Sequence, residues 1–280
     1  MYWIIFALLE PFFHGFANVI DNHFTNNLFK KTTTLVFFAS FTNILFLPII
    51  FLLDFPSFIT PSQIPFFIIL GLTGIGYLYP YYKALQNDDT SIVVSLFSLG
   101  KIFVPLLAFL LVGEILAISQ YIGFFVVILS ATLLTLNGKQ KFRLNNSFFW
   151  MILCTLIISF EVVIYKYIFN IMSWGTGFTW ATLFSFMFAL PLIFIKKTRN
   201  GIFSQVKTFK NNFKLFAFEE FLTFSGSAVT SFQPIVVLLY ALTLGRFFPK
   251  FFKEDITTKN LIKKIILFVI MVLGVIIILS

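Results

Sequence analysis

Charged residues are scarce in this chain. Asp, Glu, Lys and Arg make up 11% of its 280 residues, hydrophobic residues make up 59%, and the mean hydropathy is +0.97. Soluble domains carry about 25% charged and about 45–50% apolar residues. A water-soluble core of this size could not bury so many apolar side chains, whereas a lipid bilayer solvates them. The composition therefore excludes an ordinary soluble domain and favours a membrane protein.

Residues for common catalytic chemistry are also few. The single cysteine, Cys154, excludes an internal disulfide, and the only histidines, His14 and His23, are too far apart for an HExxH zinc motif. We find no glycine-rich phosphate loop and no G-x-S-x-G motif. The sequence therefore predicts no metal, no cofactor and no enzymatic activity. The net charge of +9 is best explained by basic loops that set membrane orientation, so no nucleic-acid partner is expected.

Hydrophobic runs of about 18–23 residues recur along the whole chain, which is the length that crosses a bilayer as a helix. They predict an all-α polytopic membrane protein with about ten transmembrane helices. The expected spans are 2–20, 34–53, 65–85, 91–112, 120–137, 147–169, 175–195 and 261–279, with the eighth and ninth inside 213–245.

The eighth expected span is short. Only 31 residues separate Lys214 from Arg246, whereas two full crossings need about 40 residues and a turn. A truncated hairpin is the favoured explanation, descending through 216–224, turning at 225–227 and returning through 228–244. A single long crossing is the alternative.

Three weak matches at nearly one offset indicate an internal repeat. Leu47–Phe51 resembles Leu190–Phe194, and the segments that begin at Asn18 and Leu129 resemble those that begin at Val162 and Leu273. They predict two five-helix halves, residues 1–138 and 147–280. Transporters with such repeats bind substrate where the halves meet.

Basic residues predict the orientation. Eighteen of the 20 fall in the odd-numbered loops, and the other two, Lys101 and Lys166, lie inside hydrophobic segments. The widest basic loops are expected at 196–212 and 246–264. The positive-inside rule then places the odd loops in the cytoplasm and both termini outside the inner (plasma) membrane.

The chain resembles the EamA-type transporters of the drug/metabolite transporter superfamily over nearly its whole length. The segments that carry the resemblance are Asp21-Asn22-His23, Ala84-Leu85, 91–98, 105–114, 120–123 and 229–239. Gly100 and Lys101 depart from the family pattern, as does the short eighth helix, and this puts transport activity in question. The resemblance implies a carrier whose helices 3, 4, 8 and 9 line a central cavity.

Ionisable groups inside apolar helices should face the bundle interior, because a charge at the bilayer centre costs about 2.5–3.5 kcal/mol. Glu10, His14, Asn18 and Asp21 are spaced four, four and three residues apart and form one polar stripe. Glu10 and His14 are candidates for proton coupling, and interhelical hydrogen bonding is the structural alternative. Asp21 is more simply read as a cap at a helix end.

Other candidate cavity residues lie on other spans. They are Tyr77, Tyr81, Lys101, Glu161, Tyr165 and Gln233. Glu161 or Glu10 is the expected partner of Lys101, while the tyrosines could instead anchor the membrane interface. The neighbouring acids Glu219 and Glu220 are expected at the membrane surface, and closing the shortened hairpin is the alternative.

Three functions remain open. The first is a secondary carrier, an exporter or exchanger, that moves a small organic metabolite by alternating access. The second is a degenerate paralogue that does not transport and acts as a membrane scaffold. The third is an intramembrane enzyme acting on lipids. The expected partners are a small-molecule substrate and the lipid bilayer, and a homodimer is an open option.

Overall fold

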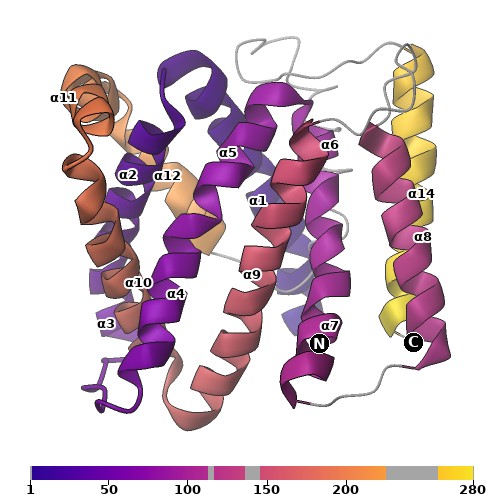
Figure 1. Cartoon of the computed structure of the whole chain (residues 1–280), viewed down its shortest axis with the longest axis horizontal. Helices are drawn as coiled ribbons and strands as arrows, with labels where there is room; N and C mark the ends of the chain where they lie inside the picture. The colour runs from indigo at the N-terminus through magenta and orange to yellow at the C-terminus, as the bar shows by residue number, and fades with distance from the viewer. Residues whose placement is uncertain (1, 113–116, 136–145, 225–257, 280) are drawn as a thin grey trace.

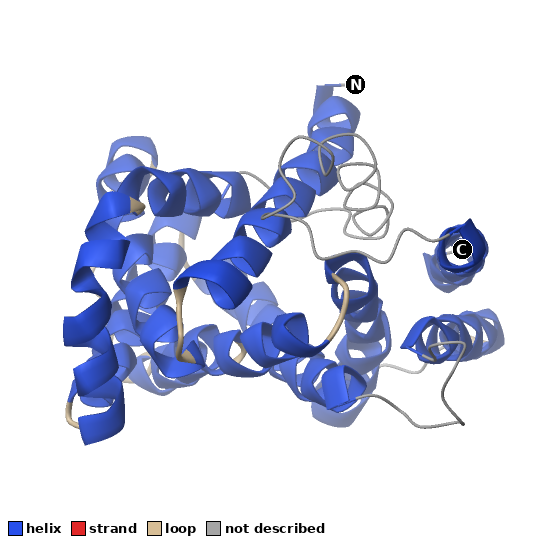
Figure 2. Cartoon of the chain, turned by 90° about the horizontal axis from the view of Figure 1, so that it is seen from above, coloured by secondary structure: helices blue, strands red, loops and turns tan. Residues whose placement is uncertain are grey.

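The computed structural model describes residues 2–112, 117–135, 146–224 and 258–279. Every regular element in these ranges is a helix, as Figure 2 shows. The first-half helices are α1 (Tyr2–His23), α2 (Thr32–Asn43), α3 (Leu47–Leu53), α4 (Ile64–Gly76), α5 (Leu78–Asn87), α6 (Thr90–Ser95), α7 (Gly100–Val112) and α8 (Ile118–Thr135). The second-half helices are α9 (Asn146–Ile171), α10 (Trp174–Ala189), α11 (Lys196–Asn211), α12 (Phe213–Phe224) and α14 (Thr258–Leu279).

Several expected spans are interrupted helices. A π-helix, η1 (Phe24–Leu28), continues α1, and short 3₁₀ turns, η2 (Ile44–Phe46), η3 (Leu96–Leu99) and η4 (Leu190–Ile193), follow α2, α6 and α10. Proline explains two of the breaks, because its ring clashes with the carbonyl four residues earlier. Pro48 acts at the end of α2, and Pro80 acts at Gly76, the last residue of α4.

Four helical segments are long and apolar enough to cross a membrane: Thr32–Leu53, Ile64–Asn87, Asn146–Ile171 and Trp174–Ile193. A shorter apolar helix covers Ile118–Ser130. The chain is therefore an all-α, multi-pass membrane protein, as its composition predicted. The count of ten spans and the two-repeat layout stay predictions.

The helices form one bundle, shown in Figure 1. The long helix α9 packs against α4, α5 and α7, while α4 also packs along α10. Helix α12 packs against α1 and α2, and α14 pairs with α8 at one edge of the bundle. Each of these contacts joins segments that are distant in sequence.

Stacked aromatic rings join α11 and α12 to the first half. Phe216 stacks on Phe24 with ring centroids 3.9 Å apart, and Phe209 stacks on Phe38 at 4.4 Å. All four side chains are buried. Aromatic pairs contribute about 0.5–1.5 kcal/mol beyond the area that they bury, so this cluster fixes where α11 and α12 sit.

The prediction of a basic loop at 196–212 is wrong, because residues 196–211 form helix α11. Thr198, Ile202, Gln205 and Phe209 recur at helical spacing and are buried. The abundance of lysine concealed this apolar period in the sequence. The descending arm of the expected hairpin is helical, as α12, but its turn and return lie outside the described residues.

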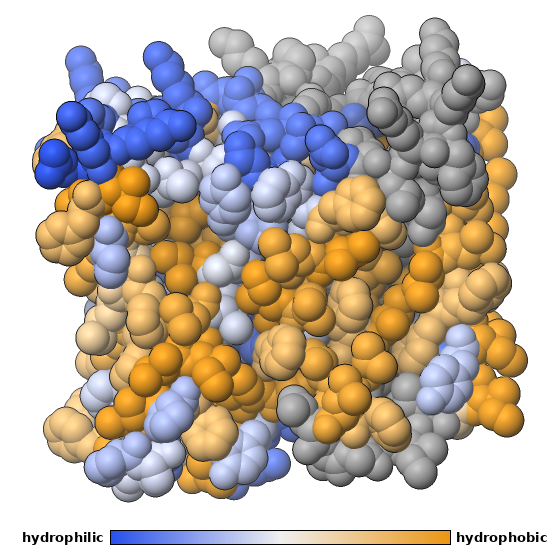
Figure 3. All heavy atoms as spheres, in the orientation of Figure 1, coloured by the Kyte–Doolittle hydropathy of each residue, from blue (hydrophilic) through white to orange (hydrophobic). Residues whose placement is uncertain are grey.

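Hydrophilic side chains gather at one end of the bundle, and apolar side chains cover its flank (Figure 3). Helix α11 lies at the hydrophilic end, whereas α1 begins and α14 ends at the opposite end (Figure 1). This division matches the cross-section of a bilayer, in which apolar flanks face lipid and polar ends face water.

Candidate functional site

The polar stripe of α1 faces α5. Asn18 Nδ2 donates to the His14 carbonyl oxygen, which leaves Asn18 Oδ1 to accept a hydrogen bond from the Tyr81 hydroxyl. The same hydroxyl lies 3.1 Å from Asp21 Oδ2. Asp21 is 7% exposed, and its Oδ1 has no hydrogen-bond partner in the described part of the chain. Asn18 and Asp21, at the end of the stripe, are therefore buried between helices instead of facing lipid.

Three tyrosines lie on the side of α4 and α5 that faces the α1 stripe. Tyr81 and Tyr82 on α5 are 4% and 3% exposed, and their ring centroids are 5.3 Å apart. Tyr77, at the junction of α4 and α5, packs against the same core. Tyr81 and Tyr82 are thus interior side chains and do not anchor the protein at the membrane interface.

Helix α12 adds two acidic residues to this region. Glu219 and Glu220 are 6% and 7% exposed, so the expectation that this pair lies at the membrane surface is wrong. Thr223 Oγ1 donates to Glu219 Oε1 over 2.9 Å. Both carboxyl groups lie close enough to interact electrostatically with Tyr82. Because α12 inserts beside α1, its acidic residues reach the interior.

Glu161 approaches the region from α9. A β-carbon built on Gly74 of α4 would lie 3.9 Å from Glu161 Oε1 and 3.3 Å from Ser185 Oγ of α10. The Glu161 side chain therefore lies close to the contact between Gly74 of α4 and Ser185 of α10. Tyr77 lies within electrostatic range of Glu161, Glu220 and Asp21, which come from three different helices.

Tyr165 lies one turn beyond Glu161 and belongs to an aromatic group. Its ring stacks on Phe169 and Phe178, with centroids 5.2 and 5.3 Å away. Tyr165 also interacts electrostatically with Glu161. We name Asn18, Asp21, Tyr77, Tyr81, Tyr82, Glu161, Tyr165, Glu219 and Glu220 the acid–tyrosine cluster.

The cluster is strongly acidic. Its carboxyl groups on α1, α9 and α12 form no ion pair with any side chain that the structure describes. A buried carboxylate without a counter-charge is unfavourable, so such groups take up a proton, bind a cation or change their surroundings. Within the described ranges, no three His, Cys, Asp or Glu side chains are placed to hold a metal ion.

Some predicted site residues are located only by their helix. Glu10 lies on α1 and Lys101 on α7, but both side chains are outside the described part of the structure, as is the whole of Gln233. The pairing of Lys101 with Glu161 or Glu10 therefore stays a prediction. His14 is half-buried on α1, on the same stripe as Asn18.

Four buried residues of the cluster were not predicted as cavity residues: Asp21, Tyr82, Glu219 and Glu220. For Asp21 the signal was present, since it continues the stripe of Asn18 at helical spacing. The pair on α12 gave no such signal, because adjacent residues on a helix point in different directions. Their burial depends on the packing of α12 against α1 and α2.

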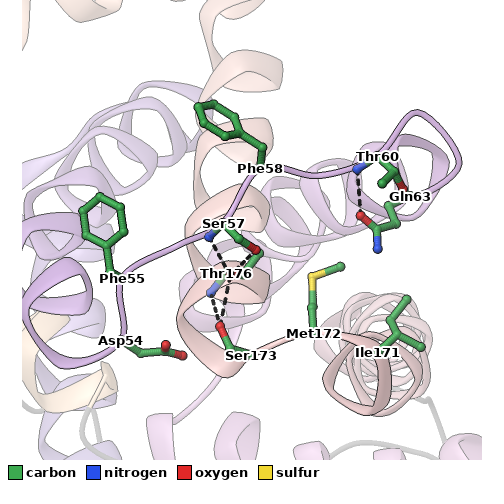
Figure 4. A pocket seen from close by; sticks show the side chains of 10 residues that line it. All are labelled: Asp54, Phe55, Ser57, Phe58, Thr60, Gln63, Ile171, Met172, Ser173 and Thr176. Atoms are coloured by element: carbon green, nitrogen blue, oxygen red, sulfur yellow. Dashed lines mark hydrogen bonds between the residues drawn. The ribbon is translucent and has the colours of Figure 1, made fainter.

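A second polar feature is a pocket of about 440 Å³, seen from close by in Figure 4. It lies at the end of the bundle opposite α11 (Figure 1). It lies between the segment that follows α3 and the start of α10. The Ser57 N–H donates to Thr176 Oγ1 over 3.0 Å, and the Gly175 N–H donates to Asp54 Oδ2 over 2.6 Å. These bonds join the two segments that border the pocket.

Comparison with known proteins relates the first part of the chain to a transporter family. Residues 1–136 match the model of the EamA-like transporter family. No curated protein matches the chain. A solved structure titled only "Crystal structure of protein" is similar in fold, with a TM-score of 0.55 at 14% sequence identity, over 96% of this chain and 97% of that chain. The match over residues 1–136 is consistent with a membrane transporter of the drug/metabolite superfamily, to which the EamA-like transporter family belongs.

Proposed function

We propose that this protein is a secondary carrier that moves a small organic solute by alternating access, with the acid–tyrosine cluster as its exchange site. One observation carries the proposal. The buried carboxyl groups of α1 and α12, and the half-buried carboxyl group of α9, lie near Tyr77 and the buried tyrosines of α5 in the interior of the bundle. Ionisable residues inside membrane proteins are costly and mark ion or substrate pathways.

The contributing helices come from both expected halves. Helix α1 packs on α12, and α5 packs on α9, so each first helix of a half meets the third helix of the other. Likewise, α2 packs on α12, and α10 packs on α4. This exchange of contacts supports a repeat of residues 1–138 and 147–280. Rocking one half against the other would then open the cluster alternately to either side.

The cluster suggests how solute and ion movements are coupled. When the site is closed, its carboxyl groups must be neutralised by protons or by a cation, because water is absent. When the site opens, water can solvate them and the neutralising species can leave. Tyr81 holds Asn18 and Asp21 through one hydroxyl group, so it positions the α1 side of the site.

Solute flux tests the function. The full chain, reconstituted in vesicles with an imposed proton gradient, is expected to transport at least one member of a panel of amino acids, amines, carboxylates and nucleosides. Tyr81→Phe removes only the hydroxyl group that contacts Asn18 and Asp21. Hydrogen bonds to charged groups contribute about 1.5–3 kcal/mol, so flux is expected to fall about tenfold or more.

Tyr121→Phe is the matched control, because Tyr121 lies on α8 outside the cluster and is 58% exposed. It should transport like the unmodified protein. Folded protein that moves nothing across the panel would refute the carrier and favour the scaffold. A Tyr81→Phe variant with unchanged flux would remove the cluster from the pathway.

The orientation is part of the proposal: the hydrophilic end that carries α11 is cytoplasmic, and both termini are outside. Lys196, Lys197, Arg199, Lys207 and Lys210 are all exposed at this end, as the positive-inside rule requires. Reporter enzymes fused separately to the two termini should be active only in the form that reports an external location. A carboxy-terminal reporter active in the cytoplasm would contradict this orientation.

A further inference from the structure

Helix α11 is fixed to the bundle along one face. The buried residues of this face are Thr198, Gly201, Ile202, Gln205 and Phe209. Gln205 Nε2 donates to the Leu28 carbonyl oxygen, and Thr198 Oγ1 donates to Thr33 Oγ1, both over 3.1 Å. Both acceptors lie at the junction of η1 and α2. The side of α11 that points away from the bundle is therefore fixed as well.

The outward side carries a basic stripe. Lys196, Arg199, Lys207 and Lys210 flank Phe203, and the five residues are spaced three, four, four and three apart. At 100° per residue they fall within about 80° of the helix circumference. Their centre lies about 140° from the centre of the buried face. The side chains of the four basic residues form no ion pair or hydrogen bond within the described ranges.

Phe203 distinguishes this stripe from an ordinary solvated surface. Its side chain is 71% exposed in the middle of the four cations, and Phe194 and Ile195 just before α11 are 84% and 52% exposed. Water disfavours such exposure, whereas the headgroup region of a bilayer accepts an aromatic ring beside basic side chains. Figure 3 shows the hydrophilic end directly adjoining the apolar flank. The stripe is thus close to the level of lipid headgroups.

From this geometry we infer that the outward face of α11 binds the phosphate headgroups of anionic phospholipids. The four basic side chains contact the phosphates, and Phe203 inserts at the boundary between headgroups and acyl chains. Charge complementarity favours an anionic lipid over a zwitterionic one. A soluble polyanion would account for the cations but not for the exposed aromatic ring. Because the bilayer surrounds the bundle, anionic lipids are already present next to α11.

Native mass spectrometry of the full chain in detergent tests this inference. The probes are phosphatidylglycerol and phosphatidylcholine with identical acyl chains. The unmodified protein is expected to retain phosphatidylglycerol preferentially. Replacing Lys196, Arg199, Lys207 and Lys210 together by glutamine should weaken that retention about tenfold or more, because each cation near an anionic surface adds to the binding free energy. Phe203→Ser should weaken the retention of both lipids, because it removes the aromatic ring that contacts the acyl chains.

The control is Lys30→Gln, which removes an exposed cation at the same end but outside α11, and it should bind phosphatidylglycerol normally. Gel filtration and thermal unfolding show whether the quadruple variant is folded, as expected for exposed positions. Equal retention of the two lipids by the unmodified protein would overturn the inference. So would undiminished phosphatidylglycerol binding by the folded quadruple variant, or equally strong binding of soluble glycerol phosphate.

Discussion

Asp89→Asn is expected to lower the free energy of unfolding by about 3 kcal/mol, at the low end of what is measured when one partner of a buried ion pair is removed. Asp89 Oδ2 lies 2.6 Å from Lys264 Nζ, and the two side chains are 18% and 5% exposed. Asp89 is the N-cap residue of α6 but its side chain makes no capping hydrogen bond, and asparagine is also favoured at this position, so the variant removes the charge without removing a cap. Thermal unfolding in detergent, followed by gel filtration, measures the loss.

The double variant Asp89→Asn, Lys264→Met is the decisive comparison. It also removes the buried charge of Lys264, which loses its contact with Asp89 in the single variant, so it should recover most of the lost stability. If the double variant is no more stable than Asp89→Asn, the cost does not arise from Lys264. Helix α14 packs mainly along α8. The ion pair of Lys264 with Asp89 also joins α14 to the connection between α5 and α6.

Gly175→Ala is expected to cost about 3 kcal/mol or more, above the usual range for an added methyl group in a packed core. A β-carbon on Gly175 would overlap the Asp54 carbonyl oxygen and lie 2.7 and 2.8 Å from Asp54 Cβ and Cγ. The obstacle includes backbone, which cannot rotate away. Separating the segments would also break the hydrogen bond from the Gly175 N–H to Asp54 Oδ2, which satisfies a donor in the first turn of α10 that has no partner within the helix. The loss is read from the unfolding temperature.

Gly76→Ala provides the matched control. It makes the same chemical change in α4, where the nearest atom to the new β-carbon is Ile157 Cγ2 at 3.9 Å, an ordinary contact. This variant should be as stable as the unmodified protein, or slightly more stable, because alanine favours a helix more than glycine does. Equal unfolding temperatures for the two variants would show that the contact at Gly175 is not a constraint.

The shared face of Asn18 and Asp21 on α1 could be predicted from the sequence, although Asp21 was expected to be a helix cap. Asn18 and Asp21 share a face at helical spacing, and that face is buried against α5. A local period is readable because it depends on one helix alone. The burial of Glu219 and Glu220 was not predictable in this way, since it depends on α12 lying beside α1. The period of α11 was present but concealed by its lysines.

The sequence by itself determined that lipid surrounds most of this chain, because composition and run length set the solvent of a helix before any packing occurs. It also determined most helix ends, through proline and the lengths of the hydrophobic runs. Only the tertiary structure decided which helices meet. Lys264 and Asp89 are 175 residues apart, and no local pattern marks them as partners. A contact in the interior depends on the shapes and charges of two surfaces, whereas one local segment of the sequence determines only one of those surfaces.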